Sequence, residues 1–437
     1  MIAALYPVMN TKWCIIADDF TGASDSAVQF GAIGRTVRLI LGGLDSITKE
    51  IRKNTDVVVV NTDTRFSSSN AAYLTVMDTA TVFKTAGQFQ FFKKIDSTLR
   101  GNIAEETAAV MAATGYRFAI VAPAAPRNHR TVVDGHCMVN GTMVTLTTAG
   151  KDPFTPVVDG RVASLFATRF PQVVQEIHLD LIRTQPTELK AAIQQGLAKG
   201  QRIFVLDAEC MEDLDAIAGL RSLSGCLFVG ASGLAEALAR SCSAALPRRP
   251  RIGPGRIAFI IGSLTPTSAV QCRLLAASSS VAELVCDSRA AIQDPGHEIA
   301  RLLALAADIP AAMALLVRTD GFEKPDEDIL VLKEKGPAFS RFLGDLTLAL
   351  AKARRLRFIL ASGGDCAARI ASALGAGSVQ LLNEIIPGLP FGYLHSPALG
   401  RRLYFVSKSG GFGPPTALVE VLDFIASSPI HQKEHVQ

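Results

Sequence analysis

The sequence lacks several patterns that would place it in a common class. It contains no GxxxxGK[ST] stretch and no GxGxxG after its first apolar run, so it has neither a Walker A loop nor a Rossmann dinucleotide fingerprint. None of its eight cysteines is spaced as a CxxC pair, so nothing indicates a zinc site or a disulfide framework. We therefore expect reduced, mostly buried thiols and a cytoplasmic location.

Long hydrophobic runs and a strong charge of one sign are also absent. The nearest approach to a membrane span, residues 302–317, is interrupted by Asp308 and Pro310, and it predicts a buried helix followed by a strand. Residues 1–9 lack the basic and apolar regions of a secretion signal, and we expect a disordered or spurious extension there. The formal net charge of +4, without a basic block interleaved with aromatics, gives nucleic-acid binding no support.

The chain does contain enough apolar sequence for large cores. Of its 437 residues 49% are hydrophobic and 19% are charged, and the mean hydropathy is +0.28. Single cores usually stop growing below about 300 residues, so two domains are expected. Prolines and glycines punctuate a basic stretch at 241–254, which indicates a linker. We place one domain at 10–245 and a second at 255–428.

Short apolar runs alternate with longer helix-like stretches along the chain, which is typical of βαβ units. The predicted strands are residues 13–17, 57–61, 90–95, 118–122, 202–206 and 227–230 in the first half, and 257–261, 312–317, 358–361 and 403–407 in the second. The predicted fold class is therefore α/β, with two domains that each contain a mostly parallel sheet flanked by helices. Ligands bind outside the carboxyl ends of such strands, so we look for functional residues there.

Charged side chains follow the first two predicted strands. Asp18 and Asp19 are adjacent carboxylates, whose repulsion requires a nearby cation or a substrate hydroxyl. The alternative is that one of them caps the following helix while the other faces water. Arg65, after the second strand, either forks a carboxylate or forms a surface pair with Asp63.

The third predicted strand ends in Lys93 and Lys94, shortly before Asp96. Successive side chains of a strand point to opposite faces, so both lysines cannot point to solvent, and one is expected to face the mouth of the sheet. That lysine needs a negative partner, which Asp96 or a bound acid would supply. The loop at 123–135, which carries a basic pair, either frames the same pocket or is a surface excursion.

Three glycine-rich turns follow predicted strands of the second half, at 262–265, 362–365 and 407–413. Glycine lets backbone N–H groups approach an anion closely, and a helix that begins just afterwards adds its positive end. Each turn alone is also compatible with a plain tight turn. Three of them together suit a polyphosphate.

Taken together, these segments resemble the four-carbon acid sugar kinase family, long catalogued as a domain of unknown function. The resemblance covers almost the whole chain and rests on seven ordered motifs: IADDFTGASD at 16–25, NTDTR at 61–65, KKIDSTLRGNI at 93–103, RTVVDG at 130–135, GASGLA at 230–235, SGGD at 362–365 and SKSGGFG at 407–413. The second and third motifs look closer to D-threonate kinases than to 3-oxo-tetronate kinases. Three positions depart from the usual pattern: His129 replaces a glycine, Thr265 a serine and Cys366 a threonine.

The resemblance implies an acid-sugar-binding N-terminal domain, a nucleotide-binding C-terminal domain and an active site in the interdomain cleft, with ATP and Mg²⁺ as cofactors. At the sugar acid it places Asp18, Asp19, Arg65, Lys94, Ile95, Asp96, Ser97 and Arg100. Among these, the candidates for the catalytic base are Asp18, Asp19 and Asp96. At the nucleotide it places Ser263, Thr265, Ser362, Gly363, Gly364, Asp365, Ser407, Lys408, Ser409, Gly410 and Gly411. The metal ligands stay unassigned, although Asp365 is a candidate to touch Mg²⁺ or the ribose.

The function that the resemblance implies is an ATP-dependent kinase that converts D-threonate to 4-phospho-D-threonate. The alternatives within the family are a 3-oxo-tetronate or erythronate kinase. A haloacid-dehalogenase-like phosphatase is a rival, but its motif separates the two aspartates by one residue, whereas Asp18 and Asp19 are adjacent. A non-enzymatic sugar-acid sensor would leave the three glycine turns without a purpose. We expect a sugar acid and ATP as partners, with no nucleic acid and no membrane, and the oligomeric state stays open.

Overall fold

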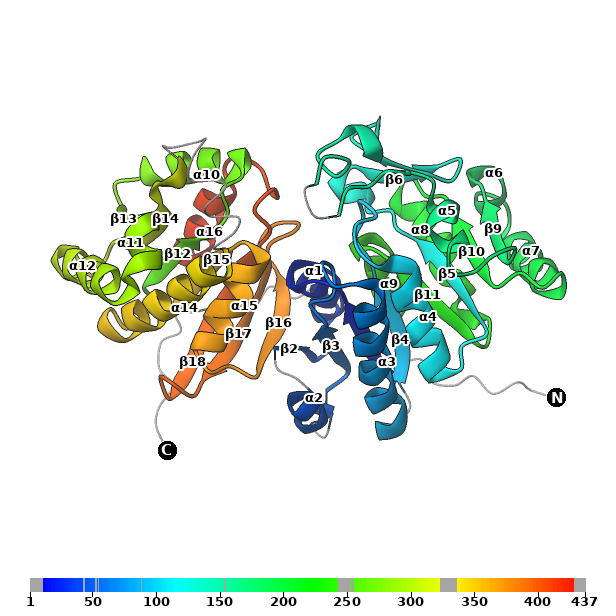
Figure 1. Cartoon of the computed structure of the whole chain (residues 1–437), viewed down its shortest axis with the longest axis horizontal. Helices are drawn as coiled ribbons and strands as arrows, with labels where there is room; N and C mark the ends of the chain where they lie inside the picture. Colours follow the sequence, from blue (N-terminus) through cyan, green and yellow to red (C-terminus); the bar gives the residue numbers. More distant parts are fainter. Residues whose placement is uncertain are drawn as a thin grey trace. The chain divides into compact units, whose positions relative to one another are not determined.

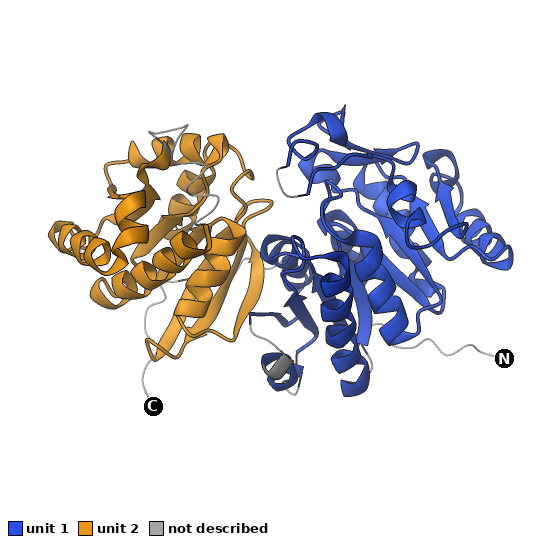
Figure 2. Cartoon of the chain, in the orientation of Figure 1, with its two compact units in different colours: residues 1–247 blue, residues 248–437 orange. Residues whose placement is uncertain are grey.

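The structure, a computed structural model, describes residues 11–41, 44–51, 53, 55–87, 89–152, 155–242, 252, 255–322 and 336–427. The expected N-terminal extension and most of the predicted basic linker lie outside these residues. The chain divides into two compact units, residues 1–247 and 248–437 (Figure 2). Each unit is α/β with a mostly parallel sheet flanked by helices, which confirms the predicted fold class (Figure 1).

The main sheet of the first unit is parallel, in the order β2-β3-β1-β4-β11-β5-β10-β9. Its strands are β1 (Lys12–Ala17), β2 (Val37–Ile40), β3 (Val57–Asn61), β4 (Phe89–Lys94), β5 (Phe118–Ala122), β9 (Val174–Ile177), β10 (Ile203–Leu206) and β11 (Cys226–Gly230). A separate antiparallel sheet consists of β6 (Arg130–Val133), β7 (His136–Val139) and β8 (Thr142–Met143).

Helices cover both faces of this sheet. They are α1 (Phe20–Ala32), α2 (Leu44–Ile51), α3 (Ser69–Ala86), α4 (Ile103–Thr114), α5 (Val162–Ala167), α6 (Leu179–Ile182), α7 (Pro186–Ala198), α8 (Met211–Ala218) and α9 (Ser232–Cys242). Parallel crossovers are right-handed, and the connections through α1 and α3 run in opposite directions across the sheet, so these two helices cover opposite faces. α1 packs with α9, and α3 packs with α4.

The direction in which the chain is wound reverses beside β1. The chain passes from β1 to β2 and β3 on one side and then crosses to β4 on the other. The register sets Ala17 at the end of β1 beside Asn61 of β3 and Lys94 of β4. In an open parallel sheet such a reversal leaves a crevice at the carboxyl ends, where ligands bind.

The second unit repeats this plan. Its sheet runs in the order β13-β14-β12-β15-β18-β17-β16, parallel from β13 to β18 and antiparallel through β17 and β16. The strands are β12 (Ile257–Ile261), β13 (Val281–Cys286), β14 (Ala314–Thr319), β15 (Phe358–Ser362), β16 (Ser378–Glu384), β17 (Pro390–Ser396) and β18 (Arg401–Lys408). The helices are α10 (Pro266–Ala276), α11 (Ser288–Gln293), α12 (Pro295–Asp308), α14 (Gly336–Ala353), α15 (Gly364–Ala373) and α16 (Ala417–Ala426). Here the winding reverses between β12 and β15.

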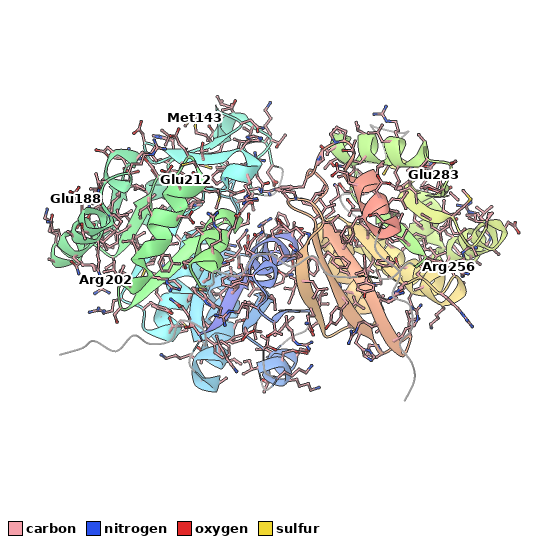
Figure 3. The ribbon with its side chains drawn as sticks, turned by 180° about the vertical axis from the view of Figure 1, so that it is seen from behind. Met143, Glu188, Arg202, Glu212, Arg256 and Glu283 are labelled. Atoms are coloured by element: carbon pink, nitrogen blue, oxygen red, sulfur yellow. The ribbon has the colours of Figure 1, made fainter. Side chains whose placement is uncertain are left out.

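Residues 302–317 form the end of α12 and most of β14, which confirms the predicted helix followed by a strand. The prediction that the helix is buried is wrong for most of this stretch, since only Leu302 and Ala306 of its helical residues are buried and Leu305 is exposed. In the described part of the chain no helix has the length and apolar character needed to cross a bilayer. Charged side chains such as Glu188, Arg202 and Glu212 of the first unit point outward into solvent (Figure 3). In the second unit Arg256 and Glu283 are also exposed, although Arg256 donates to the carbonyl of Arg354 and Glu283 pairs with Arg318.

Candidate functional site

The two carboxylates after β1 share one guanidinium. Asp18 accepts hydrogen bonds from Nε and Nη2 of Arg65 at 2.8 and 3.0 Å, and Asp19 accepts one from Nη2 at 2.7 Å. Arg65 therefore forks a carboxylate, and the alternative pairing with Asp63 is wrong. Asp19 also caps α1 by accepting from the N–H of Gly22 at 3.1 Å, whereas Asp18 is buried and does not face water.

The third candidate aspartate lies after β4 in a separate set of donors. Oδ2 of Asp96 accepts from Arg100 Nε at 2.7 Å and from the Thr98 hydroxyl at 2.5 Å. Arg100 also reaches Asp152 with Nη1, at 3.2 Å. Burial opposes ionisation of Asp96, but the charges of Arg65 and Arg100 and these hydrogen bonds outweigh it and hold its pKa far below the usual value.

Asp18 and Asp19 differ in acidity although they are adjacent. Burial acts against both charges, yet Arg65 and the two lysines at the end of β4 lower the pKa of Asp18. Burial raises the pKa of Asp19, and the negative charges of Asp18 and Asp96 add to that rise, so it lies above the usual value even though Arg65 opposes it. Asp19 is thus the better proton acceptor of the two.

A buried ion pair lies beneath the carboxylates, and the sequence did not reveal it. Lys93 Nζ lies 2.7 Å from Oε2 of Glu106 on α4, and the two side chains are 0% and 1% exposed. The other oxygen of Glu106 accepts from the Thr64 hydroxyl at 2.6 Å. The prediction that Asp96 or a bound acid pairs with an inward lysine is therefore wrong for Lys93, because α4 brings Glu106 beneath the sheet end.

Lys94 is also buried, so neither lysine points to solvent. Its Nζ donates to the carbonyl of Ile95 at 2.7 Å, and a Cβ on Gly22 would lie 2.6 Å from this nitrogen. Glycine at position 22 therefore lets the ammonium approach the start of α1. Ile95 is 1% exposed, and its N–H donates to the carbonyl of Gly230 at 3.0 Å.

The loop after β5 leads into the β6–β7 hairpin. The Cys137 thiol donates to the carbonyl of Ser97 at 3.3 Å, so the hairpin packs against the loop after β4. This contact favours the alternative in which the segment frames the pocket. One ligand atom each from Asp134, His178 and Asp207 lie within 4.8 Å of one another. The Asp207 carboxylate already accepts the N–H groups of Asp134 and Gly135, each at 2.9 Å, so it anchors the hairpin turn.

In the second unit, the turns after β12 and β18 are joined by hydroxyl groups. Thr265 caps α10, and its hydroxyl donates to the carbonyl of Gly410 at 2.9 Å. Ser268 donates to the same carbonyl at 3.0 Å. A Cβ on Gly410 would collide with the Ser263 hydroxyl, so glycine is required for this close approach. The serine that Thr265 replaces would supply the same type of hydroxyl.

The turn after β15 leaves donors available for an anion. α15 begins behind Gly363, which has a φ of +107° and provides no side-chain cap, so the first N–H groups of this helix have no side-chain acceptor at the cap. The buried Ser362 hydroxyl has no hydrogen-bond partner among the described residues. Lys408 Nζ donates to Ser409 and Gly410 carbonyls, and burial lowers its pKa to about 8. These groups fit the phosphates of a nucleotide.

Two known families match this chain, one in each of its two units. The sugar-binding N-terminal domain family matches residues 13–238, and the nucleotide-binding C-terminal domain family matches residues 258–418. A D-threonate kinase of Salmonella typhimurium is 31% identical over 95% of this chain and 98% of its own length. The chain belongs to the four-carbon acid sugar kinase family.

Other members of this family carry different substrate names. A D-erythronate kinase of Heliobacterium modesticaldum is 29% identical and a 3-oxo-tetronate kinase of Brucella melitensis is 27% identical, each over 94% of this chain and 96% of its own length. These names support the expected class of enzyme, a carbohydrate kinase. They do not distinguish which four-carbon acid this chain phosphorylates. Solved structures from Haemophilus influenzae and Salmonella typhimurium LT2 share the fold, with TM-scores of 0.74 and 0.80. They are 22% and 21% identical, over 94% of this chain and 100% and 98% of theirs.

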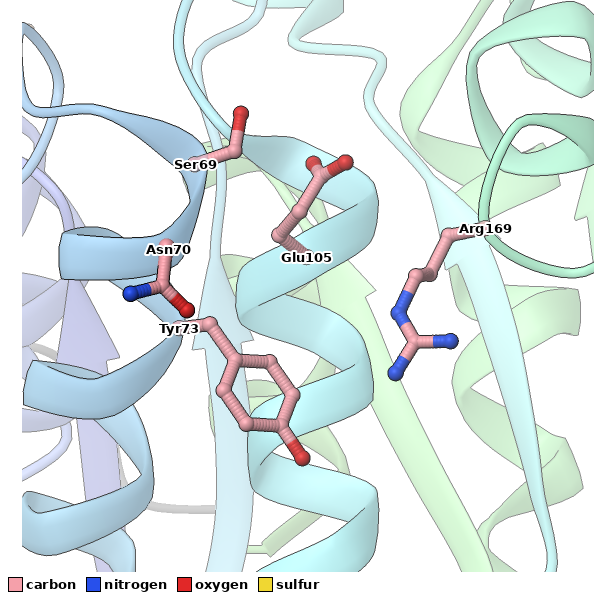
Figure 4. A pocket seen from close by; sticks show the side chains of 5 residues that line it. All are labelled: Ser69, Asn70, Tyr73, Glu105 and Arg169. Carbon is pink, nitrogen blue, oxygen red and sulfur yellow. The ribbon is translucent and has the colours of Figure 1, made fainter.

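A surface hollow of about 400 Å³ lies elsewhere on the first unit of this family member. Figure 4 shows its lining side chains, which are Ser69, Asn70, Tyr73, Glu105 and Arg169. The Arg169 guanidinium lies 5.8 Å from the centre of the Tyr73 ring. None of the predicted site residues lines this hollow, so it is separate from the carboxylate cluster.

Proposed function

We propose that this chain transfers the γ-phosphate of ATP to a hydroxyl group of a four-carbon sugar acid, converting D-threonate to 4-phospho-D-threonate. The observation that carries the proposal is the gathering of Asp18, Asp19 and Asp96 around Arg65 at the β1–β4 crevice. The relatives support a four-carbon acid as substrate. The motifs at 61–65 and 93–103 favour threonate among these acids.

Free oxygen atoms distinguish the three aspartates. Both carboxylate oxygens of Asp18 accept from Arg65, so this residue holds the cation in place. Oδ2 of Asp19 and Oδ1 of Asp96 accept no hydrogen bond from the described part of the chain. We assign the role of base to Asp19, whose raised pKa suits proton acceptance, and the role of orienting the attacking hydroxyl to Asp96.

The second unit supplies the nucleotide site in this proposal. The N–H groups at the start of α15, the Ser362 hydroxyl and the Lys408 ammonium bind the phosphates. Asp365, an exposed carboxylate in the first turn of α15, is our candidate for the Mg²⁺ ligand. Mg²⁺ supplies neutralisation of the charge on the phosphate oxygens. Phosphoryl transfer depends chiefly on such positioning and charge neutralisation, so no covalent intermediate with the protein is needed.

The test is an ADP-release assay with MgATP and a panel of D-threonate, L-threonate, D-erythronate and 3-oxo-tetronates. We expect D-threonate to have the highest kcat/KM and ³¹P NMR to show a phosphate ester on the terminal hydroxyl. A preference for another acid of the panel would correct the substrate. The absence of acid-dependent ADP release across the whole panel would refute the kinase proposal.

A further inference from the structure

We propose that Arg130 binds the carboxylate of the sugar acid and thereby makes the site selective for acids over the corresponding polyols. The inference rests on the proposed function and deepens it, because it assigns the recognition of the acid group to a residue outside the predicted site set. Arg65 then holds the carboxylates of Asp18 and Asp19 instead of the carboxylate of the substrate.

The other arginines around the crevice are already paired. Arg65 is neutralised by two carboxylates, and Arg100 is shared between Asp96 and Asp152. The guanidinium of Arg130 donates to the main-chain carbonyl of Asn128 at 3.0 Å. Within the described ranges, no carboxylate lies at ion-pair distance from Arg130. A substrate carboxylate would therefore supply a missing partner rather than compete with an existing one.

The pairing of β6 with β7 sets the direction of the Arg130 side chain. Arg130 and Val132 are two residues apart on β6, so they share one face of the hairpin. Cys137 lies opposite Val132 in the antiparallel register, and directly opposed residues share a face. The Cys137 thiol contacts the Ser97 carbonyl, so the face that carries Arg130 is the face that meets the loop after β4.

The hairpin is held on both sides of Arg130, which fixes the main chain that carries this side chain. The main chains of Ala125 and Arg130 exchange hydrogen bonds of 2.9 and 3.2 Å, and those of Val132 and Ala208 exchange bonds of 2.9 and 3.0 Å. Asp207 fixes the turn beyond them through two N–H groups. The main chain beneath the cation is therefore ordered before a ligand binds, and no binding energy is spent on ordering that part of the loop.

The charge balance favours an anion beside Arg130. Burial lowers the pKa of Arg130, and its charged neighbours are Asp96, which opposes this effect, and Arg100, which adds to it. Arginine nevertheless stays protonated in proteins, so a half-buried positive charge remains without its own carboxylate. A planar guanidinium matches a carboxylate with two parallel hydrogen bonds, which an uncharged hydroxymethyl group cannot accept in the same way.

The experiment compares Arg130→Gln, Arg130→Lys and wild type, with Arg127→Gln as the matched control. Arg127 lies in the same loop, but its side chain is 56% exposed and pairs with Glu236 at 2.6 Å. For Arg130→Gln we expect KM for D-threonate to rise about 10- to 100-fold, as for loss of a charge-assisted hydrogen-bonded pair, while KM for ATP changes little. Arg130→Lys should recover part of the loss, and kcat/KM for threitol, which lacks the carboxylate, should stay unchanged in every variant.

Calorimetric titration of each variant with D-threonate, without nucleotide, separates binding from turnover. If wild type binds and phosphorylates the acid but Arg130→Gln does so equally well, the inference fails and the proposed function stands. An effect confined to kcat or to KM for ATP would also overturn it, because it would place Arg130 at the phosphate. If wild type neither binds nor phosphorylates any acid of the panel, the proposed function itself fails and the inference falls with it.

Discussion

At the scale of single residues, the three candidate aspartates are chemically distinct because their neighbours differ. Both oxygens of Asp18 accept from Arg65, whereas Asp96 accepts from Arg100 and Thr98 through Oδ2 alone, and both carboxylates have lowered pKa values. Asp19 shares only one oxygen with its donors and has a raised pKa. Sequence alone could not separate them, since the difference comes from donors up to 47 residues away along the chain.

Asp19→Asn should reduce kcat at least about 100-fold, which is the lower end of what a general base contributes. In wild type we expect kcat/KM to fall as the pH drops through the pKa of Asp19, because protonation removes the acceptor. Because burial raises the pKa of Asp19, this acid limb of the pH profile should lie above the ordinary aspartate pKa of about 3.9. The pH profile of the variant should lack the limb, whereas the surface variant Asp215→Asn should leave the profile unchanged.

Asp96→Asn should lower kcat far more than it weakens ATP binding, since the carboxylate lies in the first unit among residues that we propose to bind the sugar acid. The acid limb of the pH profile should persist in this variant, because Asp19 is intact. Steady-state kinetics with D-threonate and separate ATP titrations measure both quantities. Near-normal turnover would remove Asp96 from the reacting centre, and loss of the limb would make it the base in place of Asp19.

The buried Lys408 should make ATP binding depend on pH at the alkaline end of the range. Burial lowers its pKa to about 8, so the ammonium is charged below that pH and becomes neutral as the pH rises through it. ATP affinity should therefore weaken above about pH 8 in wild type. A bound phosphate would raise the pKa of Lys408 and so move this weakening to higher pH. In Lys408→Met, KM for ATP should be raised at neutral pH and should lose this dependence. The exposed Lys352→Met is the control, and an unchanged pH dependence in Lys408→Met would exclude the assignment.

At the scale of elements, the buried Lys93–Glu106 pair ties together the segments that carry the site. Lys93 also donates to the carbonyls of Ile16 and Lys94, so it joins the ends of β1 and β4. Glu106 links this cation through Thr64 to the turn that presents Arg65. The pair therefore supports the carboxylate cluster from below without reaching the crevice.

Glu106→Gln should destabilise the first unit by about 3–5 kcal/mol, because it leaves the Lys93 charge buried without a carboxylate. Urea unfolding followed by circular dichroism measures the change in the free energy of unfolding. Glu105→Gln, at the neighbouring and partly exposed position of α4, should change it by no more than about 0.5 kcal/mol. Equal effects of the two substitutions on the free energy of unfolding would mean that the Lys93–Glu106 pair does not stabilise the first unit.

The sequence predicts central elements better than edge elements, for a physical reason. Strands such as β1 and β12 are buried on both faces and appear as continuous apolar runs. Edge strands were missed, since β9 reads VQEI and β13 interrupts its apolar residues with the exposed Glu283, so neither forms a continuous apolar run. The antiparallel β16–β17 pair and the three-stranded sheet of β6, β7 and β8 were missed as well. The expectation of alternating βαβ units leaves no place for antiparallel strands.

The residues of the site were likewise predicted only where apolar runs mark the ends of strands. Strand ends can be located from apolar runs, so Asp18, Arg65 and Asp96 were found by their position after such runs. Glu106 lies one residue after Glu105, and the two look alike in sequence as acids near the start of a helix. Only packing of α4 on the sheet distinguishes them. A helical wheel with Ile103 and Thr107 on the buried face would have been the available signal.

At the scale of the whole molecule, each unit has its own sheet and its own hydrophobic core. The core of the second unit is built from residues such as Phe259, Phe358 and Phe391. The core of the first includes Trp13, which packs 5.4 Å from the ring centre of Phe30. Because the residues assigned to the acid and to the nucleotide lie in different units, each ligand should stabilise the unit that binds it.

Differential scanning calorimetry tests this separation. We expect a component of the unfolding transition that a non-hydrolysable ATP analogue shifts upward and another that D-threonate shifts upward. At a ligand concentration of 100 times Kd the gain is about 2.7 kcal/mol. For units of this size that corresponds to an increase in Tm of about 5–10 °C. Lys408→Met should abolish the first shift and keep the second, and Asp19→Asn should leave the first shift in place. If both ligands move the same component, and Lys408→Met removes both shifts, then the two ligands do not bind to separate units.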